Sequence, residues 1–500
     1  MSNPQCKSSP QPLEFQSATE LLGLLRTRRI GAVELLKLHL ERLGKYNPDL
    51  NVVVATDVEG ALRAATAADN AARNAAALPP LHGLPMTIKD TFEVVGMPAT
   101  CGLPFLAGHR PQRDADAVAR LKAAGAIVYG KTNVPAAAAD WQSYNSIYGQ
   151  SNNPWDTTRS PGGSSGGAAA AVAAGLAPLE LGSDIGGSIR CPAHFCGVYG
   201  HKTSYGVVPG RGHIPPLPGQ SLAHEMGICG PLARSAQDLE LALDILAAPG
   251  ELQQPAVRIA IPPSRHERLR DFRVAVWVDS DTFAVDRLCL EAIESYVEDL
   301  RRVDVEVDFK ARPDIDWHAA YETYLATLLP IVGSGLPPGV VQDLLDAARV
   351  LPPDSTSHLA RTARALTMRH FEYFNVREQR EQLFRRWHDF FTRFDLLICP
   401  VMPTVAYPHD HRGEGAVDVR STLVDGRPRP YQDGFQWPAL ALVADLPSTA
   451  VPTGRFIHGL PMGVQVIGPY LEDRTPLRFA QLVERELGGF EAPTLQGLIP

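Results

Sequence analysis

The chain has 500 residues, of which 45% are hydrophobic and 20% are charged, and its formal net charge at pH 7 is −8. This composition is typical of a globular protein, and the lack of a basic stripe predicts no nucleic acid partner. No run approaches the ~18 apolar residues that a membrane span needs, so we expect no membrane span.

Residues 1–14 are polar, contain several prolines and are predicted to form a flexible tail. They lack the apolar stretch of a signal peptide. The chain has seven cysteines, an odd number, and no CxxC pair with metal spacing. Such cysteine usage indicates a reducing compartment, and we expect a cytoplasmic protein.

Three helices are predicted in the first part of the chain. A capping box that begins at Ser17 marks the start of the first helix. The second is expected over residues 32–43, with Asn47-Pro48 as its end. An Ala-rich pattern over residues 58–76 predicts the third.

From residue 81 onward, short apolar strands alternate with helices. Residues 84–89 and 126–129 are predicted to be strands, and residues 116–124 a helix between them. This alternation indicates an α/β sheet that helices cover on both faces. The alanine run at 168–175 is too short to span a membrane and is predicted to be a buried helix.

The later part of the chain changes texture twice. Residues 151–230 are rich in Gly, Ser and Pro between apolar runs, which favours functional loops on a rigid frame. Residues 250–395 are predicted to be helical, with mixed charges typical of solvated helix faces. The buried-strand pattern returns at 394–400 and 463–468, so we expect the sheet to close with C-terminal strands.

The first motif that points to chemistry is SPGGSSGG at 160–167, directly before the alanine run. Glycines adopt turns that are closed to other residues, and a helix N-terminus offers free amides. Three interpretations stay open here. The segment is a phosphate loop, although the Lys-Ser/Thr ending of a P-loop is missing, or a structural turn, or a loop that presents a serine.

The second motif, GSDIGGSIR at 182–190, places Ser188 after two glycines. Consecutive amides beside glycines can converge on one point as an anion-binding nest. Aimed at a carbonyl oxygen, such a nest is an oxyanion hole, and Ser188 would lie beside the reacting carbon. Taken alone, the segment also fits a tight turn.

The third motif is LPMTIKD at 84–90, in which Lys89 ends an apolar strand. A surface lysine at a strand edge is the common case. A buried lysine is costly unless it loses its proton or finds a partner. Desolvation lowers its pKa and makes it a usable base.

In this order the motifs resemble the amidase signature family. The resemblance implies an α/β amidase signature fold, with a large mixed twisted β-sheet covered by helices on both faces. It also implies a single amidase domain at 15–490, with a core at 81–240 and 394–490 and a divergent helical specificity region at about 250–390. The matching segments are GLPMTIKD (83–90), VYGKTN (128–133), SPGGSSGG (160–167), GSDIGGSIRCPA (182–193), GHKTSYG (200–206), GPLARSAQDL (230–239) and GLPMGVQVIG (459–468).

The resemblance also implies a mechanism. Ser188 attacks the substrate carbonyl, and Ser164, held by a cis peptide, passes the proton to neutral Lys89. Because Lys89 must be neutral, activity is expected to rise into alkaline pH. The chemistry requires no metal and no organic cofactor. The amides implied to hold the oxyanion are those of Ile185, Gly186, Gly187 and Ser188.

The resemblance also implies residues with supporting roles. Ser165 is expected to order the loop, and Asp184 and Arg190 to brace the oxyanion hole, although an ordinary structural salt bridge explains that pair equally well. A histidine base, either His194 or His201, is the rival to lysine. We expect both rings to serve packing or supporting hydrogen bonds instead.

The substrate pocket is predicted from positions that line the acyl pocket in fatty acid amide hydrolases. Here Ala138 and Ala139 replace large apolar side chains, with Trp141 beside them. These alanines argue against a long-chain lipid and favour a bulky or aromatic group, unless the segment is simply an Ala-rich helix. Gln436 is added because aromatic loops such as the one around it often wall a pocket.

The favoured hypothesis is an amidase that hydrolyses the C–N bond of small or aryl carboxylic amides through an acyl-enzyme on Ser188. Ester and carbamate substrates are further candidates. The alternatives are a fatty acid amide hydrolase-like enzyme, a subunit of a glutamine-dependent amidotransferase, and a non-catalytic binding protein on the same fold. We expect a small-molecule amide substrate and a monomer or homodimer.

Overall fold

The computed structural model describes residues 11–74, 77–220, 222, 224–278, 283–334, 336, 338–352, 354–413 and 419–495. Within these residues, eleven strands form one mixed sheet in the order β1-β3-β2-β6-β8-β7-β14-β15-β11-β9-β10. Their bounds are β1 Val53–Thr56, β2 Pro85–Lys89, β3 Ile127–Thr132, β6 Leu179–Asp184, β7 Tyr199–Lys202, β8 Ile228–Ala233, β9 Arg273–Val276, β10 Glu306–Asp308, β11 Leu396–Pro400, β14 Ser448–Ile457 and β15 Leu460–Ile467.

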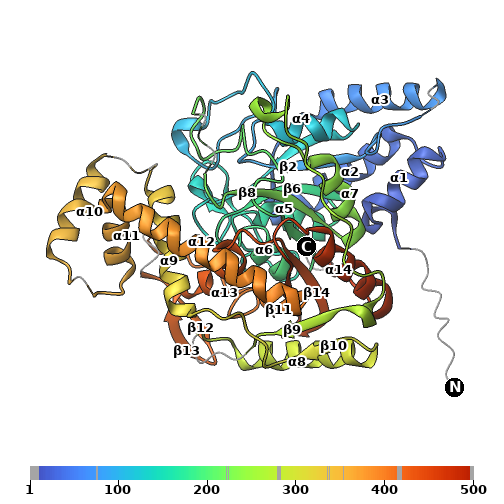
Figure 1. The fold of residues 1–500 in the computed structure, drawn as a ribbon. Coiled ribbons are helices and arrows are strands. Elements are labelled where there is room, and N and C mark those ends of the chain that lie inside the picture. The colour runs from blue at the N-terminus through green and yellow to red at the C-terminus, as the bar shows by residue number, and fades with distance from the viewer. Residues whose placement is uncertain are drawn as a thin grey trace.

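Helices cover both faces of this sheet, as predicted (Figure 1). Side chains alternate between the two faces of a strand. In β8, Leu232 joins the apolar cluster around α5, whereas Ala233 joins the cluster that contains α7. The helices are α1 Ala18–Arg26, α2 Ala32–Leu50, α3 Val58–Asn74, α4 Asp116–Ala123, α5 Gly166–Ala173, α6 Arg190–Cys196, α7 Ala236–Leu246, α8 Arg287–Arg302, α9 Trp317–Gly333, α10 Pro338–Val350, α11 His358–Thr367, α12 His370–Arg393, α13 Gln436–Leu442 and α14 Arg474–Leu487.

Two parallel neighbours in the sheet, β2 and β6, determine where the site lies. Thr87 pairs with Glu180 and Ile88 pairs with Leu181. Because the strands are parallel, their carboxyl ends meet at one edge of the sheet. Lys89 ends β2 and Asp184 ends β6 at that edge.

The early helices match their predictions with one exception. The capping box of Ser17 and Glu20 is confirmed. The prediction that Asn47-Pro48 ends the second helix is wrong, because α2 continues to Leu50. Asn47 uses its side chain instead to bond the amides of residues 52 and 53, which follow the helix end.

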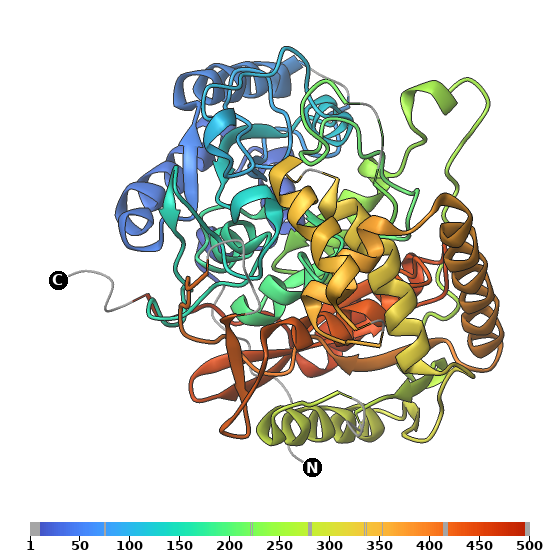
Figure 2. The ribbon, with the colours of Figure 1, turned by 90° about the vertical axis from the view of Figure 1, so that its left-hand side faces the viewer.

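The region at 250–395 is mostly helical, but it also supplies two strands that the sequence analysis missed. Strand β9 pairs in parallel with β11, and β10 pairs with β9 at the edge of the sheet. The sheet therefore ends on β10 and not on the C-terminal strands, which lie inside it. Figure 2 shows the yellow and orange helices α9, α10 and α11 standing in front of the rest.

Two small two-stranded sheets lie outside the main one. The first consists of β4 Tyr144–Asn145 and β5 Gly149–Gln150, and the second of β12 Ser421–Val424 and β13 Arg427–Pro430.

The six described cysteines are buried and free of disulfides, and Cys6 lies outside the described residues. Of the predicted tail, residues 1–10 also lie outside them, whereas Leu13–Phe15 form the short helix η1. None of the described helices is both long and apolar enough to cross a membrane.

Candidate active site

Lys89 is fully buried at the end of β2. Its Nζ lies 2.7 Å from Ser164 Oγ and 2.9 Å from Ser183 Oγ. Burial, which disfavours the charged ammonium, lowers the pKa of Lys89 to about 7. The amine is therefore in contact with one predicted catalytic serine and is substantially neutral at neutral pH.

Ser164 lies on the glycine-rich turn that leads into α5, after a cis peptide bond to Gly163. No side chain fits at Gly163, because a Cβ there would lie 2.4 Å from the carbonyl oxygen of Asp140. The next residue, Ser165, ties this turn to the second motif. Its amide donates to the carbonyl of Ser188 at 3.1 Å, and its hydroxyl donates to the carbonyl of Ser183 at 3.3 Å.

Ser188 lies between β6 and α6, and 6% of the residue is exposed. Its backbone is held against Ser165, the neighbour of Ser164. Within the described residues its hydroxyl has no hydrogen-bond partner. The structure thus joins Lys89 to Ser164 and brings the Ser188 segment beside them, without a hydrogen bond between the two serine hydroxyls.

The amides of residues 185–188 divide into two groups. The Gly187 amide donates to the Asp184 carboxylate at 2.8 Å, so it differs from the expectation of a free oxyanion donor. Among the described residues, the amides of Ile185, Gly186 and Ser188 have no hydrogen-bond acceptor. These three remain available to a bound oxyanion.

Two aromatic side chains hold the carbonyls of the same loop. The Tyr324 hydroxyl, from α9, donates to the carbonyl of Ile185 at 3.1 Å. The Trp141 indole donates to the carbonyl of Gly186 at 3.0 Å. In a trans peptide the C=O and the following N–H point in opposite directions. Both contacts therefore fix the direction of the next amide.

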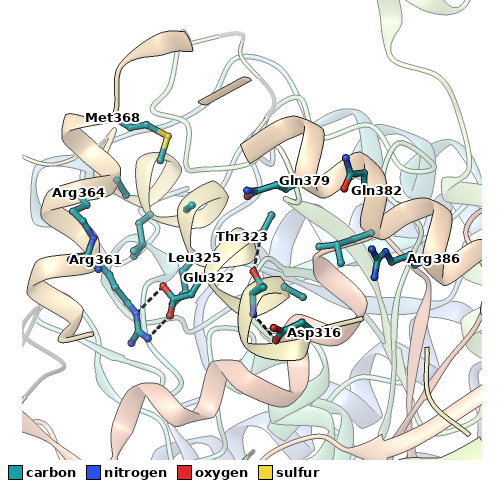
Figure 3. Close-up of a pocket in the computed structure, with 16 residues that line it drawn as sticks. Asp316, Glu322, Thr323, Leu325, Arg361, Arg364, Met368, Gln379, Gln382 and Arg386 are labelled. Atoms are coloured by element: carbon teal, nitrogen blue, oxygen red, sulfur yellow. Dashed lines mark hydrogen bonds and ion pairs between the residues drawn. The ribbon is translucent and has the colours of Figure 1, made fainter. Parts of the chain in front are cut away.

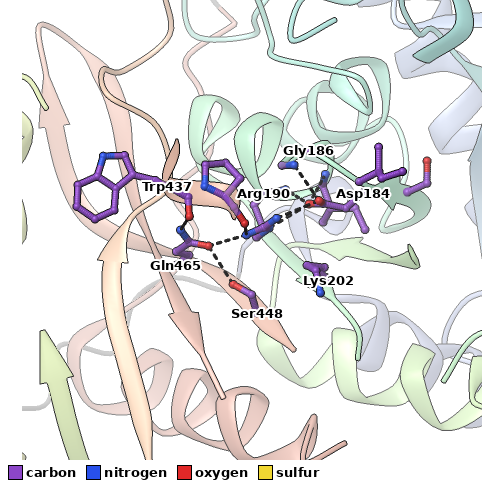
Figure 4. A network of polar contacts seen from close by, with 12 residues as sticks. Asp184, Gly186, Arg190, Lys202, Trp437, Ser448 and Gln465 are labelled. Atoms are coloured by element: carbon purple, nitrogen blue, oxygen red, sulfur yellow. Dashed lines mark hydrogen bonds and ion pairs between the residues drawn. The ribbon is translucent and has the colours of Figure 1, made fainter. Parts of the chain in front are cut away.

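Asp184 and Arg190 form a fully buried, two-pronged ion pair with both N–O distances at 3.0 Å. Burial alone would raise the pKa of Asp184, but the guanidinium of Arg190, the nearby Lys202 and the Gly187 amide together outweigh it and hold that pKa below its usual range. Arg190 also donates to Gln465 at 2.7 Å. Figure 4 shows Arg190 between Asp184 and Gln465, so the pair links the loop to β15.

The two histidines considered as rival bases are used elsewhere. His194 bonds the carbonyl of Thr404 and accepts from the amide of Gly463. His201 contacts Asp473 and Thr449. Neither ring contacts Ser188, in line with the supporting roles expected for them.

The four predicted substrate residues come from two segments of the chain, 138–141 and the start of α13. Trp141 is buried and packs edge-on against Phe435, with ring centroids 4.4 Å apart. Ala138 is partly buried and ends the short 3-10 helix η3 (Ala136–Ala138), and Ala139 follows it and is exposed. This short 3-10 helix replaces the Ala-rich helix of the alternative interpretation. Gln436 begins α13, and its Oε1 is buried without a partner in the described structure.

Three residues of the site were missed by the sequence analysis. Ser183 contacts Lys89, His213 contacts Ser183 at 2.8 Å, and Tyr324 contacts the carbonyl of Ile185. Ser183 lies within the second motif and could have been found from its position before Asp184. The other two stand in segments without a motif, and only the folded chain brings them here.

A cavity of about 560 Å³ lies elsewhere, between α9, α11 and α12 (Figure 3). Arg361 and Glu322 pair across it. Lys89, Ser164 and Ser188 do not line it, so we do not assign the chemistry to it. In the described part of the chain no group of three or more His, Cys, Asp or Glu side chains is placed to hold a metal ion.

The sequence of this chain is similar to those of known proteins over nearly its whole length. The family model described as Amidase matches residues 34–477. Fatty-acid amide hydrolase 2 of Homo sapiens is 30% identical over 97% of this chain and 91% of its own length. The A subunit of the glutamyl-tRNA(Gln) amidotransferase of Rhodopirellula baltica is 32% identical over 93% of this chain and 95% of its own.

Solved structures agree on the fold. A bacterial aryl acylamidase of the amidase signature enzymes superposes with a TM-score of 0.80 over 96% of this chain and 97% of its own. At 22% sequence identity, this likeness concerns the fold alone.

Proposed function

Because this chain belongs to the amidase signature family and is a hydrolase that acts on C–N bonds, we propose that it cleaves small or aryl carboxylic amides through an acyl-enzyme on Ser188. The observation that carries the proposal is the buried Lys89 amine, 2.7 Å from Ser164 and with its pKa lowered to about 7. Such an amine accepts a proton at neutral pH, as a base for a serine nucleophile must.

The proposed reaction begins when Ser188 Oγ attacks the carbonyl carbon. The Ser188 proton passes to Ser164, and the Ser164 proton passes to the neutral amine of Lys89. The contact between the two serines has to tighten when substrate binds, as catalytic hydrogen bonds commonly do. The amides of Ile185, Gly186 and Ser188 hold the oxyanion.

The second half of the reaction reverses the proton path. The C–N bond breaks, the leaving amine takes a proton from Ser164, and Ser164 recovers one from Lys89. Water then attacks the ester on Ser188 and passes one proton through Ser164 to Lys89. The ester C–O bond breaks, Ser188 Oγ takes that proton back along the same path, and the carboxylic acid leaves. One proton of water thereby replaces the proton that left with the amine, so all three groups regain their starting protonation and no cofactor is needed to balance the cycle.

The aromatic surroundings of the oxyanion loop support an aryl substrate. Phe435 approaches Gly186 so closely that a Cβ there would lie 2.7 Å from the ring. Trp141 packs on both Phe435 and Tyr431. Aromatic walls with a few fixed polar groups are typical of small-molecule sites.

The test is hydrolysis of a panel that holds an acyl anilide, a simple aliphatic amide, a long-chain fatty acid amide, glutamine, an ester and a carbamate. We expect the anilide or the aliphatic amide to give the highest kcat/KM. Ser188→Ala should abolish turnover, and Lys89→Ala should lower kcat by about 10²–10⁴-fold. Full activity retained in Ser188→Ala, or a fluorophosphonate adduct on another residue, would refute the mechanism.

A substitution at Ala139 tests whether this residue lines the substrate pocket. Ala139 has an ordinary backbone φ of −102°, whereas Ala138 has a φ of 56°, where a larger side chain is strained. Ala139→Phe should lower kcat/KM for the anilide by about 10-fold or more relative to the aliphatic amide. An unchanged ratio between these two substrates would remove Ala139 from the pocket.

A further inference from the structure

Lys89 has a second hydrogen-bonded contact that leads away from the serines. Its Nζ lies 2.9 Å from Ser183 Oγ, and Ser183 Oγ lies 2.8 Å from His213 Nε2. The other ring nitrogen, His213 Nδ1, lies 2.8 Å from the carbonyl oxygen of Pro215. The imidazole thus connects the amine to a fixed backbone group.

The directions of these hydrogen bonds follow from the chemistry of each group. A carbonyl oxygen only accepts, so His213 Nδ1 carries the proton of the neutral ring. Burial, together with the nearby Lys89, lowers the pKa of His213 to about 3, so the ring is neutral. Nε2 then only accepts, and the Ser183 hydroxyl donates to it.

The amine of Lys89 is left with one arrangement. Because the Ser183 proton points to His213, Ser183 Oγ faces Lys89 as an acceptor. A neutral amine has two N–H donors and one lone pair. The donors meet Ser183 Oγ at 2.9 Å and the carbonyl of Ser183 at 3.5 Å, which leaves the lone pair for Ser164 Oγ at 2.7 Å.

We propose that His213 is a positioning residue for the amide hydrolysis. By fixing the direction of the Ser183 hydroxyl, it turns the lone pair of Lys89 toward Ser164. Without an acceptor on its far side, Ser183 would be free to donate to that lone pair and compete with the Ser164 proton. This inference rests on the proposed role of Lys89 as the base.

Two conservative replacements separate the contacts of the ring. His213→Gln carries an amide oxygen near the position of Nε2 and can accept from Ser183, but it loses the contact to Pro215. His213→Asn keeps a donor for Pro215 and cannot reach Ser183. His213→Phe keeps the ring shape and its edge-on packing on Phe92, at 4.9 Å between centroids, and loses both polar contacts.

We expect His213→Asn and His213→Phe to lower kcat for the best amide of the panel by about 10- to 100-fold with KM unchanged. His213→Gln should retain most of kcat. A loss in His213→Gln as large as in His213→Asn, or larger, would overturn the inference, because His213→Gln keeps the contact to Ser183 and lacks only the contact to Pro215. Melting temperatures of all three variants check that each is folded.

A double variant tests whether His213 acts through Ser183. Ser183→Ala removes the hydroxyl, so adding His213→Phe to it should cause no further loss of kcat. Independent, multiplying losses would contradict the proposal. Lys89→Ala and Ser188→Ala in the same assay keep the two hypotheses apart. If these two lose activity while the His213 variants do not, only the positioning role fails; if they keep activity, the proposed function itself fails.

Discussion

At the scale of single residues, burial is what suits Lys89 to the proposed role of base. Desolvation lowers its pKa, while Cys101 and the Asp184 carboxylate act in the opposite direction and only partly offset it. The lysine therefore needs no neighbouring cation to be neutral. Its position at the buried end of β2 is sufficient.

The first prediction concerns pH. Only neutral Lys89 accepts a proton, so kcat/KM should rise about tenfold per pH unit below pH 7, reach half of its maximum near pH 7 and level off above it. A pH–rate profile with the best amide measures this.

Lys202 offers a matched control for that profile. It is buried, with its pKa also lowered to about 7 by desolvation, but it donates to the carbonyl of Leu446 and touches neither serine. Lys202→Met should therefore keep the midpoint of the profile. A midpoint that moves in this variant, or a flat profile in the parent protein, would contradict the assignment.

A second prediction concerns the Asp184–Arg190 pair. Arg190→Met leaves the Asp184 charge buried without its partner, which should cost about 3–5 kcal/mol in the free energy of unfolding. Urea denaturation measures the change. In the exposed pair Arg349–Asp346, Arg349→Met should change stability by less than about 1 kcal/mol. Similar losses in both variants would mean that burial does not decide the effect.

Some residues of the site were predictable from the sequence, and others were not. Lys89 and Ser164 stand in motifs with dense local signals, and the structure places them in contact. The commitment of the Gly187 amide to Asp184 was not foreseen, because it depends on how the turn closes. His213 and Tyr324 carry no local signal, since tertiary packing alone brings them to the site.

At the scale of elements, α9 links the divergent region to the loop at 185–188, the proposed oxyanion site. Tyr324 reaches from this helix to the carbonyl of Ile185, and that peptide also carries the Gly186 amide. The residue lies outside the motifs, yet it orients a proposed oxyanion donor. A change on this helix is therefore expected to alter the rate.

The third prediction is that Tyr324→Phe lowers kcat by about 5- to 10-fold, the equivalent of one hydrogen bond worth ~1 kcal/mol, and leaves KM nearly unchanged. Steady-state kinetics with the best amide measures it. Tyr321→Phe, one turn earlier on α9, is the control, because no contact joins its hydroxyl to the oxyanion loop within the described residues. Equal effects in the two variants would argue for a general loosening of the helix.

Elements were predictable where their signal was long or buried on both faces. The strands β2 and β11 follow continuous apolar runs and were found. Strands β9 and β10 have four and three residues, and the helical texture around them concealed them. The end of α2 was misjudged because Asn47-Pro48 serves the last turn of a helix as well as a loop.

At the scale of the whole molecule, one sheet joins the N-terminal half to the divergent region. Strand β9 is buried between β10 and β11, so this strand is part of the core and not of an appended lobe. The large α/β class was predictable from alternating strands and helices. The strand order was not, because non-local pairing leaves no mark on local sequence.

The fourth prediction follows from this continuity. Val274→Asp buries an unpaired carboxylate in β9 and should destabilise the whole protein by about 3–5 kcal/mol, with loss of activity in step. Thermal unfolding followed together with activity measures both. Glu306→Gln on the exposed side of β10 should change neither. Full activity at the parental melting temperature in Val274→Asp would show that β9 is dispensable to the core.

Lys89 and Ser183 stand at the ends of neighbouring parallel strands, so the backbone ladder of the sheet fixes their spacing. The proposed recognition groups, among them Trp141 and Phe435, come instead from the segment at 138–141 and from the turn before α13. Mutational drift in those segments leaves the base in register. For evolution, this means that a lineage can exchange its substrates in small steps while the spacing of Lys89 and Ser183 is inherited unchanged.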